Sequence, residues 1–368
     1  MSFYQKLIQQ LNSNKISIRI IISLFRSHST ALAIALSQSD EITAQISEPF
    51  VHDDLVGRSF NYDPSSEKNY RPFDRGCENI TLASQSNDHE SILVKEMSAH
   101  LIKPEFEMLI PLASHFIFTI RDPKLQVLSL LTRLANDILS EKFGDNLSVS
   151  NILRLYDQGV TVIDKRTILL MGNDEIRVKQ ILSFIDRSQE TVLSDEDITL
   201  ACQKVLNITT TIATIAWNNL FQITNLLREN QHRNYIIIDG SELLQDPKSL
   251  LQLVTSAIKL EFNESMIKEW RKATGKSYQS SVGPLLKEKA QTNSWTGPAI
   301  QSKFFKQQEK SVPNTIILST LPTSLQSLID TLNKDYYQPL RADPNFITSQ
   351  TRENLINQVQ EDILPTPL

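Results

Sequence analysis

Short apolar runs alternate with polar turns and helical patterns along the chain. Three of the runs are rich in β-branched or aromatic residues and occupy residues 18–22, 115–120 and 235–238, and residues 92–94 form a weaker fourth. Continuous apolar runs of this length predict strands that are buried on both faces of a sheet. Because a helical pattern follows each long run, we predict an α/β fold with a parallel sheet flanked by helices, whose ligands lie beyond the carboxyl ends of the strands.

Other segments complete the predicted architecture. Residues 51–90 are polar and contain Pro64 and Pro72, so we expect a loop that lies over the site. Residues 131–230 carry long helical periodicity, which predicts a large helical insertion that acts as a lid or an acceptor wall. A further helix is expected at residues 321–332. We interpret residues 1–368 as a single α/β domain that contains the insertion.

Composition and charge narrow the function classes. The 368 residues, 40% hydrophobic and 21% charged, are enough to bury one large core. A net charge of −5 argues against nucleic acid as a general partner. Six histidines and the two distant cysteines, Cys77 and Cys202, form no metal-binding spacing, so we predict no metal. The sequence shows no signal peptide and no membrane span, which predicts a cytoplasmic protein, and leaves the oligomeric state open.

The turn after the first apolar run carries the most informative chemistry. A buried strand, a hydroxyl-rich turn and a helix start there in succession. The free N–H groups of a first helical turn and the positive end of the helix dipole favour a phosphate or another anion. The candidate anion-binding residues are Arg26, Ser27, His28, Ser29 and Thr30.

This turn resembles the 5′-phosphosulfate loop of the sulfotransferases that use 3′-phosphoadenosine 5′-phosphosulfate (PAPS). In that family a strand ends in a Pro-Arg/Lys-Ser-Gly-Ser/Thr-Thr run. Here Phe25 stands at the proline position and His28 at the glycine position. Because glycine tolerates a positive φ and close approach of a ligand, His28 either narrows the phosphate cradle or adopts an uncommon backbone geometry.

Two later motifs follow in the order expected for this family. Arg121 ends the run 115–120, and Ser129 follows it eight residues later on the next expected helix. The resemblance implies that these two residues hold the 3′-phosphate; alone, the motif is more typical of a surface arginine beside a helix start. Asp239 and Asp246 resemble the family's later strand and turn, where we expect them to cap a helix and fix a loop.

Sulfuryl transfer requires a base, because the acceptor hydroxyl or amine loses its proton as it attacks sulfur. Glu48 resembles the base of carbohydrate-type bacterial sulfotransferases. Lys95 and His100 resemble the lysine and histidine of the small-molecule enzymes, with Lys95 stabilising the leaving phosphate. The alternatives are a solvated loop carboxylate for Glu48, a partly buried helical histidine for His100 and a strand-end lysine for Lys95.

The motif order over residues 18–123 and 235–305 resembles the P-loop-like sulfotransferase family. The resemblance implies PAPS as donor, adenosine 3′,5′-bisphosphate as product and an unidentified small-molecule or carbohydrate acceptor. A degenerate member that binds a nucleotide or an anion without transfer is the alternative. A small-molecule kinase is a third candidate, but its loop lysine is missing. Trp270 and Trp295 are either counterparts of a nucleotide loop or core residues.

Overall fold

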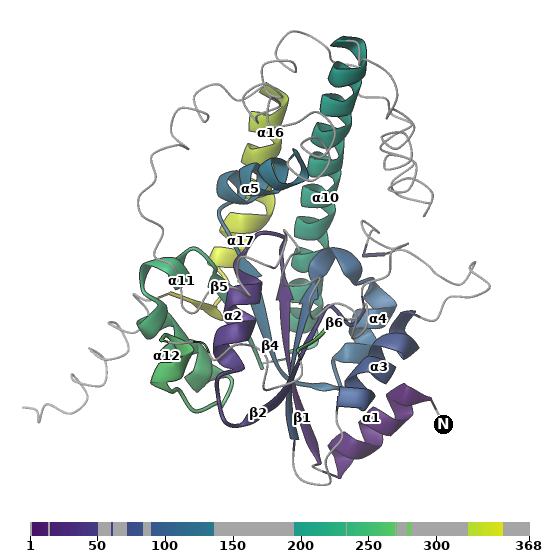
Figure 1. Ribbon diagram of the computed structural model, residues 1–368, viewed down its shortest axis with the longest axis vertical. Helices are drawn as coiled ribbons and strands as arrows, with labels where there is room; N and C mark the ends of the chain where they lie inside the picture. The colour runs from purple at the N-terminus through teal and green to yellow at the C-terminus, as the bar shows by residue number, and fades with distance from the viewer. Residues whose placement is uncertain are drawn as a thin grey trace, which may run out of the picture.

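The sheet is the centre of the structure. The computed structural model describes residues 2–13, 15–50, 60–61, 72–83, 90–135, 195–232, 234–268, 270, 278–280 and 323–348. Within them, seven strands form one sheet in the order β6-β2-β3-β1-β4-β5-β7, and all neighbouring pairs are parallel (Figure 1). The strands are β1 Ile16–Ser23, β2 Ile42–Ser47, β3 Glu90–Met97, β4 Ala113–Ile120, β5 Tyr235–Asp239, β6 Tyr278–Ser280 and β7 Phe346–Ile347. The predicted α/β class, with a parallel sheet flanked by helices, is confirmed.

Helices cover both faces of this sheet. They are α1 Phe3–Asn12, α2 Ser29–Leu36, α3 Pro72–Ala83, α4 Lys103–Leu109, α5 Pro123–Ala135, α10 Asp195–Glu229, α11 Glu242–Gln245, α12 Pro247–Ala257, α16 Thr323–Leu332 and α17 Gln338–Arg341. A π-helical turn, Asn333–Tyr337, joins α16 to α17, and two short 3₁₀ helices lie at Ser98–His100 and Glu264–Met266.

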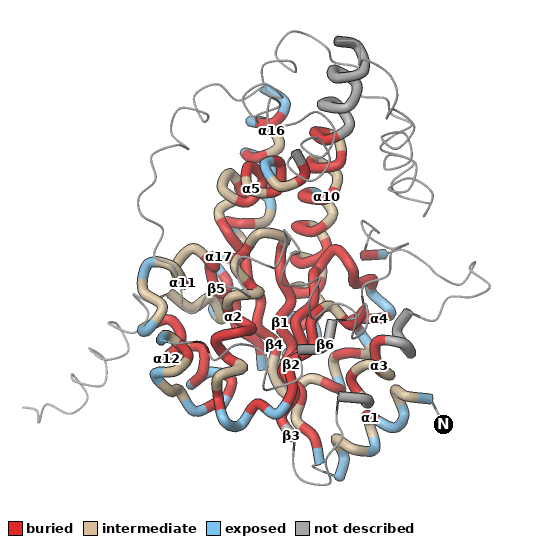
Figure 2. Tube along the Cα trace, viewed as in Figure 1, coloured by how far each residue is buried: buried red, intermediate tan, exposed pale blue. Residues whose placement is uncertain are grey.

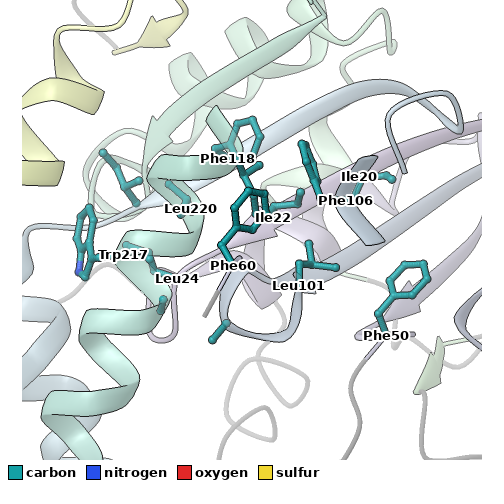
Figure 3. Close-up of a cluster of buried hydrophobic side chains, with 14 of the residues drawn as sticks. Ile20, Ile22, Leu24, Phe50, Phe60, Leu101, Phe106, Phe118, Trp217 and Leu220 are labelled. Carbon is teal, nitrogen blue, oxygen red and sulfur yellow. The ribbon is translucent and has the colours of Figure 1, made fainter. Parts of the chain in front are cut away.

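The side-chain alternation of the strands divides the interior into two apolar layers. Ile20 and Ile22 of β1 belong to the layer that includes residues of α1, α3, α4, α5, α10 and α16. Ile21 belongs to the other layer, with residues of α2 and α12. Figure 2 shows the strands buried between the helices, and Figure 3 shows Phe118 of β4 in one cluster with Trp217 and Leu220 of α10. Burial on both faces explains why the strands read as continuous apolar runs.

The strand order locates the crevice where ligands bind in such sheets. Strand β1 lies between β3 and β4. The chain passes from β1 through α2 to β2 on one side, whereas the connection from β4 leads to β5 on the other. Connections that diverge in this way open a crevice at the carboxyl ends of β1 and β4. Figure 1 shows α5, α10 and α16 beyond this edge of the sheet.

Two segment predictions need comment. The loop expected at residues 51–90 contains helix α3, so this part of the prediction is wrong. Pro72 is the first residue of that helix, where proline is favoured, and Cys77 and Ile80 share its buried face. The helical insertion expected at residues 131–230 is not confirmed. Its described part, α10, packs into the same apolar layer as β1, and residues 136–194 lie outside the described residues.

Candidate functional site

The loop between β1 and α2 is tied to β4 from inside. The amide of Leu24 donates to the carbonyl oxygen of Thr119 at 3.2 Å. The Ser27 hydroxyl donates to the Leu24 carbonyl oxygen at 2.7 Å and lies 2.8 Å from the Thr119 hydroxyl. Ser27 is fully buried, so its side chain fixes the loop to the sheet.

Two residues of the loop have a left-handed backbone. Arg26 and His28 both have a φ of 63°, a conformation uncommon for residues other than glycine. The uncommon geometry expected at His28 is therefore present. His28 is the N-cap of α2, and its side chain makes no capping hydrogen bond. Left-handed residues in such turns help successive backbone N–H groups to form a concavity that binds an anion. The first turn of α2, which contains Ser29 and Thr30, directly follows this loop and adds its own free N–H groups.

The structure brings the second motif against this loop. Arg121, the residue after β4, donates from Nη1 to the carbonyl oxygen of Arg26 at 2.9 Å. Arg26 in turn donates from Nε to the hydroxyl of Ser129, on α5, at 3.1 Å. The two groups of residues that the sequence suggested for two phosphates therefore meet at Arg26. Gln126 adds a further tie, because its amide donates to the Phe25 carbonyl oxygen at 3.1 Å.

Electrostatics favour an anion at this point. The side chain of Arg121 is only 7% exposed, and its buried Nε has no hydrogen-bond partner. Burial, with the nearby charge of Arg26, lowers the pKa of Arg121 to about 10, while Asp239 and Asp122 oppose this change. An unsatisfied N–H on a buried cation is costly, and a second cation beside it adds repulsion. A bound anion would relieve both costs.

The His28 imidazole is part of the same environment. Its Nε2 is buried and has no hydrogen-bond partner. Burial, with the charges of Arg121 and Arg26, lowers the pKa of His28 to about 3. The ring is therefore neutral at physiological pH.

The turn after β5 supports the loop from a third side. A Cβ at Gly240 would lie 1.9 Å from the carbonyl oxygen of Ser27, so only glycine fits there. The Asp239 carboxylate accepts from the Ser241 amide at 2.8 Å and from the Tyr337 hydroxyl at 2.7 Å. Asp246 accepts from the Ser249 amide at 3.1 Å at the start of α12. The capping and loop-fixing roles expected for both aspartates are confirmed.

Charged residues form a second cluster at the ends of β2 and β3. Lys95, 3% exposed, forms an ion pair with Glu48 and lies 3.0 Å from the sulfur of Met97. Burial raises the pKa of Glu48, but the charges of Lys95 and His100 and the hydrogen bond from Lys95 together bring it below its ordinary value. Glu48 also has a positive φ, 54°. The structure thus brings the three suggested catalytic residues into one cluster.

Glu96 belongs to this cluster and was not anticipated from the sequence. Its fully buried carboxylate shares a 2.8 Å hydrogen bond with Nδ1 of His100 and accepts from the Phe50 amide at 2.8 Å. The His100 ring also contacts Phe25 edge-on, with 5.8 Å between ring centroids. Glu96 therefore orients His100, and Phe25 links the cluster to the loop after β1. The spacing of four residues between Glu96 and His100 was the available signal.

The remaining sequence-based candidates are the two tryptophans, a metal site and a membrane-spanning helix. Trp270 is 4% exposed, packs in the layer with α2 and α12, and donates to the Met266 carbonyl oxygen at 2.7 Å, which confirms the core alternative. Trp295 lies outside the described residues. Among the described residues, no three His, Cys, Asp or Glu side chains gather to hold a metal ion. None of the helices in these parts of the chain is long and apolar enough to cross a membrane.

Comparison with known proteins gives no family. No family model matches the chain, and neither a curated protein nor a solved structure matches it. Any function proposed for it therefore depends on the residues at the carboxyl edge of the sheet and on their geometry.

Proposed function

We propose that this protein is a PAPS-dependent sulfotransferase that transfers a sulfuryl group to a hydroxyl or amine of a small-molecule or carbohydrate acceptor. The observation that supports it best is the meeting of Arg26, Arg121 and Ser129 at the start of α2. Two neighbouring guanidinium groups, one with a buried N–H that lacks a partner, suit a donor that carries two separate anionic groups.

Different groups of the protein would hold the two anionic parts of PAPS. The concavity of the loop and the first turn of α2, with Ser29 and Thr30, would hold the 5′-phosphosulfate. Arg121 and Ser129 would hold the 3′-phosphate, and Arg26 lies between these two groups. Since Arg26 Nε now donates to Ser129, donor binding would exchange this 3.1 Å hydrogen bond for bonds to phosphate oxygens. The buried Ser27 hydroxyl would keep the loop in place.

The charged cluster at β2 and β3 would supply the proton transfer. In sulfuryl transfer the acceptor oxygen or nitrogen forms a new bond to sulfur, and the bond between sulfur and the bridging phosphate oxygen breaks, so that the bisphosphate leaves with this oxygen. The proton of the acceptor passes to the base. Glu48 and His100 both remain candidates: the low pKa of Glu48 keeps it ionised, and Glu96 orients His100. Lys95 belongs to β3 and pairs with Glu48, and its charge would stabilise the departing phosphate.

A second candidate function is binding without transfer. It is favoured by one observation, the His28 ring at a position where the resembled family has no side chain. A ring there reduces the space beside the backbone N–H groups. Such a protein would bind adenosine 3′,5′-bisphosphate and PAPS but would not release product with any acceptor.

The first experiment is calorimetric titration with adenosine 3′,5′-bisphosphate. We expect micromolar binding that weakens at least about tenfold in Arg121→Ala and with 5′-AMP, which lacks the 3′-phosphate. Arg228→Ala is the control, because Arg228 pairs with Asp343 near the opposite end of β5. Equal affinity for the two nucleotides would contradict the assignment of the 3′-phosphate.

Turnover distinguishes the two candidate functions. PAPS is incubated with a panel of hydroxyl and amine acceptors, and adenosine 3′,5′-bisphosphate is quantified. Product that forms only with an acceptor and declines in Lys95→Ala supports transfer. Nucleotide binding without product across the panel supports the binding function.

A further inference from the structure

His28 is one of the candidate anion-binding residues, but the proposed placement of the donor gives its side chain no contact. It lies at the N-cap of α2, with a φ of 63° and no capping hydrogen bond. Its Nε2 is buried without a partner, although the ring adjoins a site rich in hydrogen-bond donors. A left-handed backbone is uncommon for histidine, and it persists only where the surrounding structure enforces it. Strain of this kind is concentrated at ligand sites.

The groups that face His28 are cationic. Arg26 belongs to its own loop, and Arg121 reaches the loop from the end of β4. Both charges, together with burial, lower the pKa of His28 to about 3. Helix α2 carries no charged residue, and the acidic groups that act on Arg121 are Asp239 and Asp122. The imidazole is neutral because it is buried and because the charges beside it are positive.

We infer that His28 is a proton-coupled ligand of the anion, neutral in the absence of an anion and protonated when a dianion lies in the loop. The inference rests on the anion site of the proposed function and goes beyond it, since it assigns a binding role and a pH dependence to a residue specific to this chain. Protonated His28 would donate from Nε2 to an anion oxygen beside the Nε of Arg121.

The sign of the pH dependence follows from the charges. An opposite charge within about 4–6 Å changes the pKa of an ionisable side chain by about 1–3, so the two charges of a dianion would raise the pKa of His28 from about 3 to between about 5 and 9. Binding then takes up a proton. The affinity therefore increases as the pH falls, by at most about tenfold per pH unit for one proton.

Inorganic sulfate is the probe, because it remains a dianion throughout the range from pH 5.5 to 8 and adds no titration of its own. Sulfate affinity is measured by calorimetry across this range, in buffers of different ionisation enthalpy, so that proton uptake is read directly. The variants are His28→Asn, which tolerates the left-handed backbone but cannot become charged, and His28→Gly. His232→Asn is the matched control, since burial also lowers the pKa of His232 and its Nδ1 also lacks a partner.

We expect the wild-type protein and His232→Asn to bind sulfate several-fold to tenfold more tightly per pH unit of acidification, with uptake of up to one proton. Both His28 variants should bind without this dependence. Thermal melting confirms that each variant is folded. Sulfate binding that is independent of pH in the wild type, or equally dependent in His28→Asn, overturns the inference and leaves the anion site intact. Absence of sulfate binding in every protein rejects the anion site together with the inference. The nucleotide and turnover experiments test the sulfotransferase function separately.

Discussion

Gly240→Ala tests whether the turn after β5 holds the anion loop. The added Cβ would lie 1.9 Å from the Ser27 carbonyl oxygen and 2.8 Å from the Ser27 carbonyl carbon, whereas real Cβ contacts are essentially never under 3.0 Å. Both atoms belong to the backbone, so no side-chain rotation relieves the contact. Either the turn or the loop must move by roughly 1 Å.

The expected cost follows from this displacement. Overpacking of a well-packed interior costs about 1–3 kcal/mol of unfolding free energy. For a protein of 368 residues each kcal/mol lowers the melting temperature by only about 1.3 °C, which gives a decrease of roughly 1–4 °C. A movement of the Ser27 backbone also misaligns the N–H groups of the loop. We therefore expect sulfate and adenosine 3′,5′-bisphosphate to bind at least about tenfold more weakly, which corresponds to about 1.4 kcal/mol.

Gly76→Ala is the matched control for this variant. A Cβ at Gly76 would lie 2.2 Å from Cδ1 of Phe50, so it also disturbs a packed site. The three nearest atoms all belong to this side-chain ring, whereas the nearest atoms at Gly240 belong to the backbone of the loop after β1. Thermal melting and calorimetry on both variants should show a stability loss in each and an affinity loss in Gly240→Ala alone.

Two results would refute the reasoning. If Gly240→Ala melts at a lower temperature but binds both anions with wild-type affinity, the turn supports the fold and not the loop. If Gly76→Ala loses as much affinity as Gly240→Ala, the loss reports general destabilisation. Either result would mean that Gly240 does not hold the anion-binding loop in place.

Two further substitutions test other contacts. Lys95→Met removes the cation beside Glu48. Because the pKa of Glu48 is below its ordinary value, the ion pair with Lys95 stabilises the wild-type protein above about pH 4.5. This contribution to stability is lost when acidification protonates Glu48. Urea unfolding should show a loss of about 1–3 kcal/mol at pH 7 and a smaller fall in stability from pH 5 to pH 3 than in the wild type. Arg19→Met removes donors to the carbonyl oxygens of Ile258, at 3.0 Å, and Lys259, at 2.8 Å, and should cost about 2–4 kcal/mol with sulfate affinity unchanged.

For each of these two predictions, one result would contradict it. An unchanged acid unfolding profile in Lys95→Met would mean that the ion pair with Glu48 does not stabilise the fold. A loss of sulfate affinity in Arg19→Met would be unexpected, because Arg19 holds the C-terminal end of α12, on the opposite edge of the sheet from the loop after β1.

The sequence was informative where a local pattern decides the structure. Strands β1, β4 and β5 were predictable because burial on both faces demands an unbroken apolar run. The left-handed backbone at His28 was one of two predicted outcomes, because the residue stands where the resembled loop has glycine. Asp246 was predictable as a cap because an aspartate before proline and a helix has few other roles.

The contacts that complete the site were not predictable in the same way. Gly240 touches Ser27, and Arg121 touches Arg26, across large separations in sequence, and no local pattern records such pairs. The role of Glu96 was hidden because a charged residue inside a strand is usually a solvent-facing one, whereas here it satisfies His100 and a backbone amide. Helix α3 was missed because most of its residues are polar and only a few apolar residues, such as Cys77 and Ile80, form its buried face.

The contact between Gly240 and the loop after β1 also has a consequence for the order in which the chain is made. The loop itself is synthesised early, and β2, β3 and β4 follow it before the long helix α10. The turn that holds the Ser27 carbonyl comes only after α10 and β5 have left the ribosome. A nascent chain therefore carries the residues of the anion site well before it carries their support. The anion site is completed late in synthesis, when the sheet around β1 has already been made.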